Sequence, residues 1–283
     1  MVARVTVYHI PDHKRSILMG AAMAKGVAAV GDQPRLVPYT GFQAPAGDVA
    51  VFYGFDDRLQ EIFNAYRAAG RPVVYVDMGY WGRLEGGKWS GYHKVSVNAR
   101  HPTEYFQRVK HDDKRVARFG LKIEPWRSGS TIIVAGTSGK GAVVDGFYPQ
   151  QWETEAINTL RKHTDREIIY RPKPSWTGAT PIPGSTFCQT KVDIRQWLSD
   201  CHAVVTHHSN AAIDGLLAGV PAFCLEGVAA PMACADLDKI ESPLFPEGRQ
   251  QWINDISYCQ WTPAEMEAGL AWRHLKDEGL VTA

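Results

Sequence analysis

The sequence predicts an α/β protein with two domains, each a parallel β-sheet covered by helices. Three observations predict this fold class. Short runs of β-branched and aromatic residues alternate with stretches of helical spacing, which is typical of β-α-β units. This pattern stops near residue 81 and starts again near residue 130. The length of 283 residues, of which 45% are hydrophobic, suffices for two cores of ordinary size.

The first half contains three predicted strands, each a short run of β-branched and aromatic residues: 4–10, 48–53 and 73–76. Helical spacing predicts two helices between them, 16–30, which Ser16 can cap, and 59–69, which ends before Gly70. Strands that alternate with helices pair in parallel, because each crossover helix returns the chain to the same end of the sheet. The first half therefore predicts one α/β domain.

The second half repeats the pattern. Its predicted strands are apolar runs with few charges: 130–135, 167–170, 203–206 and 221–225. Helical stretches are expected between and before them: 152–163, 194–199 and 209–217. A final helix begins at a capping box formed by Thr262 and Glu265, has Pro263 in its first position, and continues to about residue 276. This second α/β domain joins the first near residues 124–129.

The charge of the chain is divided unevenly between its halves. The formal net charge is only +1. Residues 1–125 hold 18 Lys and Arg against 12 Asp and Glu, a balance of +6. Residues 126–283 hold 13 against 18, a balance of −5. The first half is therefore the part suited to an anionic partner.

Several classes of protein are excluded by composition. No run of 18 apolar residues is present, which excludes a transmembrane helix. Residues 1–8 have the pattern of a strand and lack the segments of a signal peptide, so we expect a cytoplasmic protein, in the host cytoplasm if the chain is viral. The five cysteines lack the spacing of a zinc or redox site. Asp236 and Asp238 have the spacing of a metal-binding pair but lie in an acidic stretch, so no metal site is expected.

Two segments at predicted strand ends have the residues of an anion site. The first is a glycine-rich turn after strand 130–135, whose N–H groups, hydroxyls and ammonium can hold a phosphate. Its residues before Gly141 are Gly136, Thr137, Ser138, Gly139 and Lys140. The second contains Arg171 and Lys173, two cations between prolines at the end of strand 167–170. A plain turn and surface charge are the alternatives for these two segments.

A third segment follows strand 203–206 and contains four polar residues and then a carboxylate: His207, His208, Ser209, Asn210 and Asp214. A helix that begins here directs its first N–H groups toward the strand ends, where a phosphate binds favourably. A carboxylate one turn along can accept both hydroxyls of a ribose. Glu226, after strand 221–225, is a further candidate for a sugar contact. The alternative for the third segment is an ordinary capped helix.

The third segment resembles the donor-binding domain of GT-B glycosyltransferases, above all that of capsular-polysaccharide transferases. The family has a Ser/Thr-rich helix start, an acidic residue, and Gly-(Lys/Val)-Pro before a strand. The residues that match in order are Ser209, Asn210, Asp214, Gly219, Val220 and Pro221. The family usually has Glu where this chain has Asp214, which shortens the reach to the ribose. Residues 136–141 resemble its glycine loop, and Arg171 and Lys173 resemble the cations that neutralise the donor diphosphate; the resemblance covers about residues 130–225.

The resemblance implies the GT-B fold, an α/β fold in which two Rossmann-like parallel-sheet domains face a cleft. It implies an acceptor-binding domain at 1–125, a nucleotide-sugar-binding domain at 126–262, and a C-terminal helix at 263–283 that packs back toward the first domain. The implied activity is a hexosyltransferase-like transfer from a nucleotide sugar, with a UDP-sugar as the expected donor. Cations and helix dipoles assist the departure of the nucleotide, so no metal or other cofactor is expected to be required.

The acceptor hydroxyl needs a general base within hydrogen-bond reach. Asp77 is the first candidate, because it ends strand 73–76 at the sheet edge where ligands bind. A loop-capping role is the alternative for Asp77. His13, after the first strand, is the second candidate, and His93 and His101 are weaker ones.

Residues 81–127 have a different composition, with 11 Lys and Arg and 7 large aromatic residues. Cations interleaved with aromatic rings suit a phosphate backbone with a stacked or flipped base. The residues expected to contact nucleic acid are Arg83, Lys88, Trp89, Tyr92, Lys94, Arg100, Arg108, Lys110, Lys114 and Arg115. A solvated basic face with aromatic core residues is the alternative.

This segment favours duplex DNA that carries hydroxymethylated pyrimidines as the acceptor, since some viral GT-B enzymes glycosylate such bases and a basic acceptor-side domain is compatible with that class. A glycan or lipid-linked acceptor is the second hypothesis, favoured by the capsular-type donor motif. A nucleotide-sugar 2-epimerase of the same fold is the third, and it would need no basic segment. A nucleic-acid-binding module without catalysis would leave residues 209–214 unexplained.

Overall fold

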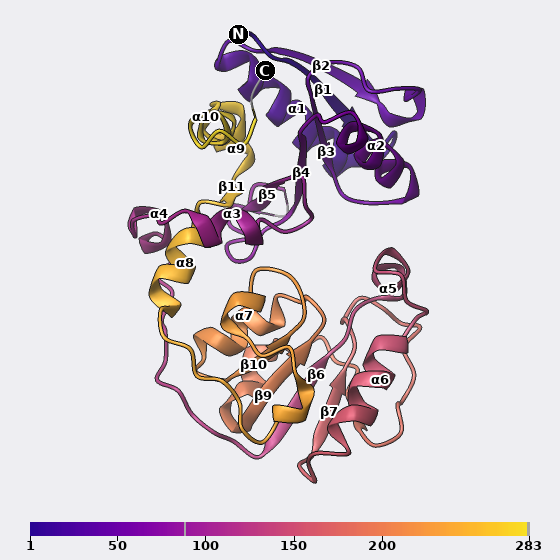
Figure 1. Ribbon diagram of the computed structural model, residues 1–283, viewed down its shortest axis with the longest axis vertical. Coiled ribbons are helices and arrows are strands. Elements are labelled where there is room, and N and C mark those ends of the chain that lie inside the picture. Colours follow the sequence, from indigo (N-terminus) through magenta and orange to yellow (C-terminus); the bar gives the residue numbers. More distant parts are fainter. Residues whose placement is uncertain (88, 282–283) are drawn as a thin grey trace. The chain divides into compact units, whose positions relative to one another are not determined.

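The computed structural model describes residues 1–87 and 89–281, and the chain divides into two compact units. Unit 1 consists of Met1–Pro102 and of the segment that begins at Ile256, and unit 2 is Thr103–Asp255. Both units are α/β (Figure 1). These limits differ from the expected boundaries after residues 125 and 262. The difference arises because residues 103–125 cluster with unit 2, and a strand of two residues after Cys259 joins the sheet of unit 1.

Among its described residues, unit 1 contains a six-stranded sheet with the order β11-β5-β4-β3-β1-β2. The strands are β1 (Arg4–His9), β2 (Gln33–Pro38), β3 (Val49–Tyr53), β4 (Val73–Met78), β5 (His93–Val97) and β11 (Gln260–Trp261). Strands β1 to β4 pair in parallel, whereas β5 is antiparallel to both β4 and β11. The strands predicted in the first half are β1, β3 and β4. The sequence does not predict β2, because it contains two prolines, which a sheet tolerates at an edge such as this one.

Helices α1 (Lys14–Ala29) and α2 (Asp57–Ala68) pack against opposite faces of this sheet. The alternation is clear on β3, where Val49 and Val51 join the core under α1 while Ala50 and Phe52 join the core under α2. The helix α1 begins earlier than predicted, because His13 rather than Ser16 caps it.

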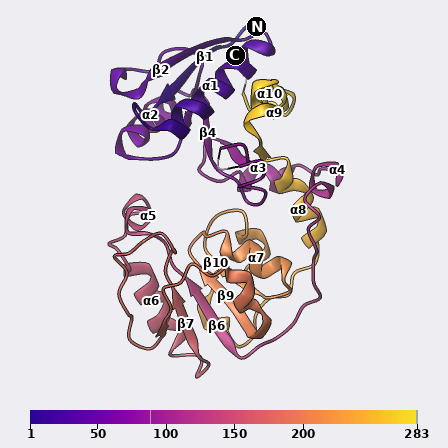
Figure 2. The ribbon, with the colours of Figure 1, turned by 180° about the vertical axis from the view of Figure 1, so that it is seen from behind.

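The C-terminal segment forms α9 (Pro263–Glu267) and α10 (Leu270–Asp277), which pack beside α1 (Figures 1 and 2). The predicted capping box of Thr262 and Glu265 is present. Gly269 then adopts a left-handed conformation, with φ of 79°, and divides the predicted single helix into two. Gly26 permits the close approach of α1, because a Cβ there would lie 1.9 Å from the carbonyl oxygen of Met266.

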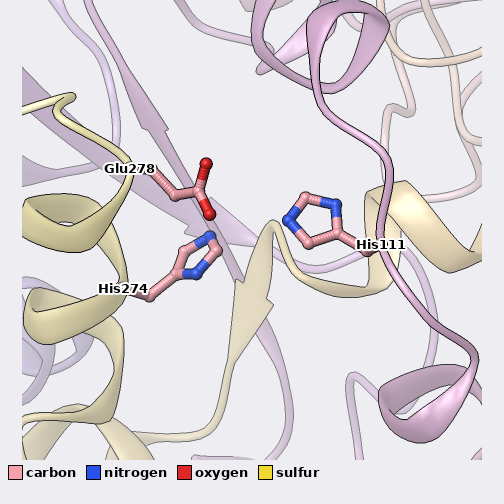
Figure 3. Close-up of side chains that lie close together, drawn as sticks. All are labelled: His111, His274 and Glu278. Carbon is pink, nitrogen blue, oxygen red and sulfur yellow. The ribbon is translucent and has the colours of Figure 1, made fainter.

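His274 of α10 and Glu278, the C-cap residue that follows this helix, are one turn apart, and Figure 3 shows both side chains on the same side. The N–H of Glu278 donates to the carbonyl of His274 (3.0 Å) and closes the last turn. The His274 ring lies 5.4 Å from the ring of Trp261 in β11, measured between centroids. His111, which Figure 3 also labels, belongs to unit 2.

Asp32 ties the C-terminal segment to the N-terminal strand of unit 1. Its buried carboxylate accepts hydrogen bonds from the N–H of Ala3 (2.9 Å), the indole of Trp272 (2.7 Å) and the ammonium of Lys276 (2.8 Å). Burial favours the neutral acid, but the hydrogen bonds from Lys276 and Trp272 outweigh it and hold the pKa of Asp32 below its ordinary value. Asp32 is therefore a charged carboxylate that joins Ala3, just before β1, to Trp272 and Lys276 of α10.

Unit 2 contains a five-stranded parallel sheet with the order β10-β9-β6-β7-β8. Its strands are β6 (Thr131–Ala135), β7 (Ile168–Arg171), β8 (Thr186–Phe187), β9 (Cys201–Thr206) and β10 (Ala222–Cys224). The four strands predicted in the second half are β6, β7, β9 and β10. Helix α6 (Gln151–Leu160) packs on one face, while α7 (Ala211–Leu217) and the 3₁₀ helix η2 (Ile194–Asp200) pack on the other.

Four further helices belong to residues 103–257: α3 (Thr103–Arg108), α4 (Lys114–Ala117), α5 (Gly139–Val144) and α8 (Arg249–Ser257). Hydrogen bonds attach α3 and the loop after it to the rest of unit 2. Thr103 donates its hydroxyl to the carbonyl of Gly227 (3.0 Å). The carboxylate of Asp255, which is 1% exposed, accepts from the N–H of His111 (2.7 Å) and from Lys110 (3.2 Å). In the part of the chain that the structure describes, no helix has the length and apolar character needed to cross a bilayer.

The substitution Asp32→Asn should lower the free energy of unfolding by about 1–3 kcal/mol, because the pair with Lys276 is lost while Trp272 keeps an acceptor. The depressed pKa of Asp32 gives stability that is present above the ordinary carboxyl pKa of about 4 and is lost as the pH falls below it. The loss between pH 7 and pH 3, measured by urea unfolding, should therefore be smaller in the variant. Asp277→Asn removes an exposed carboxylate from the same segment and should change stability by less than about 0.5 kcal/mol. Equal stability of Asp32→Asn and the wild type would contradict the role of Asp32.

Candidate functional site

Hydrogen bonds join the carboxyl ends of four strands at one edge of the unit 2 sheet. The N–H of Gly136, after β6, donates to the carbonyl of Arg171 at the end of β7 (2.9 Å). Thr206, at the end of β9, donates its hydroxyl to the last carbonyl of β6 (2.8 Å). The N–H of Glu226, after β10, donates to the carbonyl of His207 (3.0 Å). The parallel topology thus brings the glycine turn, Arg171, the segment after β9 and Glu226 to one edge, where ligands of such sheets bind.

The glycine turn (residues 136–141) leads from β6 into α5. Ser138 is the N-cap of α5, and its hydroxyl accepts the N–H of Gly141 (3.1 Å). Gly139 lies against the indole of Trp176, which a Cβ at this position would approach to 3.2 Å. Lys140 is exposed, so its ammonium can move toward a ligand beside the turn.

A buried carboxylate lies beneath the glycine turn. Glu153 of α6 is fully buried and accepts the N–H of Thr137 at 2.7 Å, so this N–H, expected to face an anion, is used within the protein. A Cβ on Gly136 would meet both Glu153 and the ring of Tyr170 at 2.9 Å, so only glycine fits there. Burial and the nearby charge of Glu153 raise the pKa of Tyr170. No local sequence pattern points to Glu153, because it lies in a stretch of ordinary helical spacing.

Arg171 ends β7 as a buried cation with 8% of its surface exposed. One terminal nitrogen of its guanidinium donates to the carbonyl of Val192, while Nε has no hydrogen-bond partner among the described residues. Burial lowers the pKa of Arg171, and the carboxylates of Asp193 and Asp214 act in the opposite direction. The Nε–H of Arg171 can therefore donate a hydrogen bond to an anion at the sheet edge. Lys173, two residues further along, is exposed.

The segment after β9 turns into α7 through Ser209, whose hydroxyl accepts the N–H of the first residue of α7 (3.2 Å). Asn210 is the N-cap residue of α7, and Asp214 lies in its first turn. The charge of Asp214 acts on both Arg171 and Arg195. The expected ribose-binding carboxylate and the expected diphosphate-binding cation therefore lie in one region of unit 2.

His207 and His208 form a pair in which the two Nδ1 atoms lie 2.8 Å apart. His207 is 6% exposed, and its ring makes T-shaped contacts with the rings of Phe147 and Trp152. Nδ1 of His208 lies 3.5 Å from a carboxylate oxygen of Asp145. The sequence predicts that both histidines contact the nucleotide-sugar donor, whereas no local pattern points to Asp145.

Asp77 lies at the carboxyl end of β4, as predicted. Its carboxylate accepts hydrogen bonds from the hydroxyl of Tyr75 (2.7 Å) and the N–H of Met78 (2.8 Å). Lys94 is its paired residue on β5 and is 6% exposed. Burial lowers the pKa of Lys94 to about 8, and the charge of Asp77 limits this decrease. Asp77 thus lies at the strand end with a buried lysine opposite it on the neighbouring strand.

His93, next to Lys94, is a buried imidazole with 1% of its surface exposed. Its Nδ1 lies 2.8 Å from the carbonyl of Gly91, which assigns the proton to Nδ1. Burial, assisted by the charge of Arg15, lowers the pKa of His93 to about 4, so the ring is neutral at pH 7. Its Nε2 has no hydrogen-bond partner within residues 1–87 and 89–281.

His13 has a structural role in unit 1. Its Nδ1 accepts the N–H of Ser16 (3.0 Å) as the N-cap of α1, and its ring stacks on Tyr53 with a centroid separation of 6.1 Å. The hydroxyl of Ser16 instead accepts the N–H of Ile10 (2.9 Å). One nitrogen of His13 is thus engaged in the cap, and Asp77 stays the first candidate for a general base because it lies at the carboxyl end of β4.

The structure divides the residues expected to contact nucleic acid. Tyr92, Lys94 and Arg115 are buried, with 4, 6 and 7% of their surfaces exposed, which argues against direct contact with phosphate or base. Composition alone does not distinguish a buried cation from an exposed one. Lys88 lies outside the described residues. The others keep exposed surface: Arg83, Trp89, Arg100, Arg108, Lys110 and Lys114.

No protein-family model and no curated protein sequence matches the chain. Solved structures do match it over most of its length. The β-Kdo 2,4 transferase structure of KpsC from Thermosulfurimonas dismutans is 10% identical, with 90% of this chain and 91% of that chain covered and a TM-score of 0.54. The β-Kdo 2,7 transferase structure of KpsC from the same organism is 12% identical, with 96% and 99% covered and a TM-score of 0.50. The fold is GT-B. At these identities the likeness shows the fold alone, with its two Rossmann-like domains.

The neutral state of His93 predicts an acid sensitivity of unit 1. Its pKa of about 4 lies below the ordinary value of 6.5, so the unfolded chain binds more protons between these values and stability falls as the pH drops from 6.5 to 4. Full loss would amount to about 3 kcal/mol. His93→Gln keeps a donor for the Gly91 carbonyl and removes the titration, so its unfolding free energy should fall less over this range.

Ser96→Ala, on the same strand, provides the control, because it removes a buried hydrogen bond without changing a titrating group. Guanidinium unfolding at several pH values between 7 and 4 measures the slopes. The account of His93 would be wrong if His93→Gln had the same pH slope as the wild type and Ser96→Ala.

Proposed function

We propose that this protein is a glycosyltransferase that moves a sugar from a nucleotide sugar to a hydroxyl group of an acceptor. The observation that carries this proposal is the buried Arg171 at the sheet edge where the glycine turn begins, because its Nε is without a partner among the described residues. A buried donor that lacks a partner destabilises the protein, which a bound anion would relieve. The GT-B fold supports the proposal, since the KpsC structures bear the names of Kdo transferases.

The donor phosphate is proposed to bind between Arg171, the glycine turn and the exposed Lys140 and Lys173. A guanidinium donates directed, charge-assisted hydrogen bonds to phosphate oxygens. These cations stabilise the negative charge that develops on the phosphate as its bond to the sugar breaks. Asp214, whose charge acts on Arg171, is proposed to accept the ribose hydroxyls.

Asp77 of unit 1 is proposed to be the general base. In the transfer step the acceptor hydroxyl gives its proton to Asp77, and the oxygen lone pair forms the new bond to the anomeric carbon. The bond from that carbon to the donor phosphate breaks, and its electron pair leaves with the nucleotide. Tyr75 and the N–H of Met78 each donate to one carboxylate oxygen, which holds Asp77 in place for this role.

A glycan or lipid-linked hydroxyl is proposed as the acceptor in place of duplex DNA, because burial and ion pairing of the expected contact residues count against DNA. Three of the residues expected to contact DNA are buried. Two of the exposed cations are paired with carboxylates, Lys110 with Asp255 (3.2 Å) and Lys114 with Asp112 (2.8 Å). Ion pairing reduces the positive charge that a phosphate backbone would neutralise.

Isothermal titration of the full chain with uridine and cytidine nucleotides tests the donor site. At least one of these nucleotides should bind, and Arg171→Ala should weaken its binding by about 10- to 100-fold, since a charge-assisted hydrogen bond contributes about 1.5–3 kcal/mol. Arg171→Lys should recover part of the affinity, because it restores the charge without the directed donors.

Lys162→Ala is the matched control, because it removes an exposed cation at the end of α6 and should leave the affinity unchanged. Thermal unfolding of each variant shows whether it is folded at the temperature of the titration. Absence of binding for every uridine and cytidine nucleotide, or equal affinity of Arg171→Ala and the wild type, would refute the proposed donor site.

A further inference from the structure

Three potential metal ligands of unit 2 converge beside the glycine turn: Asp145, His207 and His208. One ligand atom from each lies within 4.8 Å of the other two. The Nδ1 atoms of the two histidines are 2.8 Å apart, and Nδ1 of His208 is 3.5 Å from a carboxylate oxygen of Asp145. These two separations lie on either side of the distance of about 3.3 Å between neighbouring ligands of a tetrahedral zinc ion, whose bonds are about 2.0–2.1 Å long.

The surrounding residues hold two of these ligands in place. The ring of His207 makes T-shaped contacts with the rings of Phe147 and Trp152, with centroid separations of 5.4 and 5.7 Å. Its carbonyl accepts the N–H groups of Leu225 and Glu226, which fixes the backbone of the segment after β9. Asp145 is the C-cap of α5, and only 2% of its side chain is exposed. Fixed, buried ligands reduce the entropy lost when an ion binds.

The chemistry of these ligands selects a class of ion. Two imidazoles and one carboxylate suit a divalent first-row transition metal such as zinc, whereas magnesium and calcium prefer sites made of oxygen atoms. The carboxylate offsets part of the positive charge of the ion in this buried position. We propose that Asp145, His207 and His208 bind one divalent transition-metal ion.

Three protein ligands leave a fourth position open in a tetrahedral site. His208 is the most exposed of the three, with 24% of its side chain accessible, so this position is within reach of solvent or of an anionic ligand. The proposal concerns metal binding and does not depend on the proposed sugar transfer. It differs from the expectation of a chain without a metal, because neither the GT-B resemblance nor sequence spacing brings Asp145 to the two histidines.

Metal titration of the full chain, after treatment with a chelator and dialysis, tests the site. Zinc binding is measured by competition with a chromophoric chelator, and Co²⁺ is used as a spectroscopic probe. The wild type should bind one more equivalent of zinc than His208→Ala or Asp145→Asn, or should bind that equivalent at least about 100-fold more tightly. The reason is that loss of an outer-shell partner of a metal site already lowers metal affinity by about 10- to 100-fold, and these variants lose a direct ligand. Co²⁺ should give the strong visible absorption of a four-coordinate site in the wild type.

His163→Ala is the matched control, because His163 contacts a single carboxylate, Asp238 (2.9 Å), on the surface of the same unit. It should keep the zinc stoichiometry and the Co²⁺ spectrum of the wild type. Equal zinc binding by the wild type, His208→Ala and Asp145→Asn would overturn the proposal. Should a variant fail to fold, the wild-type Co²⁺ spectrum still decides, because the lack of a visible band at saturating Co²⁺ also overturns it.

Discussion

Parallel pairing around β6 is the constraint on which the arrangement of unit 2 depends. The strand pairs with β7 on one side and with β9 on the other, so all three carboxyl ends reach the same edge of the sheet. A shift of the register by one residue would move Ile132 and Val134 from one core to the opposite face. It would also separate Gly136 from the Arg171 carbonyl that it contacts. The position of the candidate donor site is thus a consequence of how the sheet packs.

Both units concentrate buried ionisable groups at strand ends, where apolar packing alone would exclude them. Unit 2 buries Arg171 and Glu153 there, and unit 1 buries His93 and Lys94 beside the end of β4. Burial of such groups destabilises a fold unless hydrogen bonds or opposite charges compensate. Perturbed ionisable groups cluster at functional sites, because binding and proton transfer need them. Buried ionisable groups at strand ends therefore support a ligand site in each unit.

The sequence predicts the parts of the fold and of the site that are encoded locally. Runs of valine and isoleucine predict β1, β3, β6 and β9, because a buried strand needs them along its whole length. The strands β5 and β11 depend on pairing between residues 93–97 and 260–261, which no local pattern reveals. The donor motif lies in one continuous segment, so its residues could be named in advance.

The other site residues could not be predicted, because their contacts are made between segments that are distant in sequence. Asp145 and Glu153 lie in helical stretches, and only the fold brings them to the histidine pair and to the glycine turn. Lys94 lies in a segment with the composition of a basic surface, but its side chain is buried. Whether an ionisable residue is buried depends on contacts distant in sequence, which composition does not report.

The most direct test of sugar transfer is mass spectrometry of acceptors after incubation of the full chain with a panel of nucleotide sugars. Oligosaccharides, hydroxymethylated duplex DNA and a reaction without acceptor are compared. The account predicts that a saccharide gains the mass of one sugar residue as the nucleotide is released. Product formation should fall by about 100-fold or more in Asp77→Asn. A sugar added to the DNA instead would contradict the favoured acceptor, and conversion of the nucleotide sugar to an isomer without any acceptor would contradict glycosyl transfer itself.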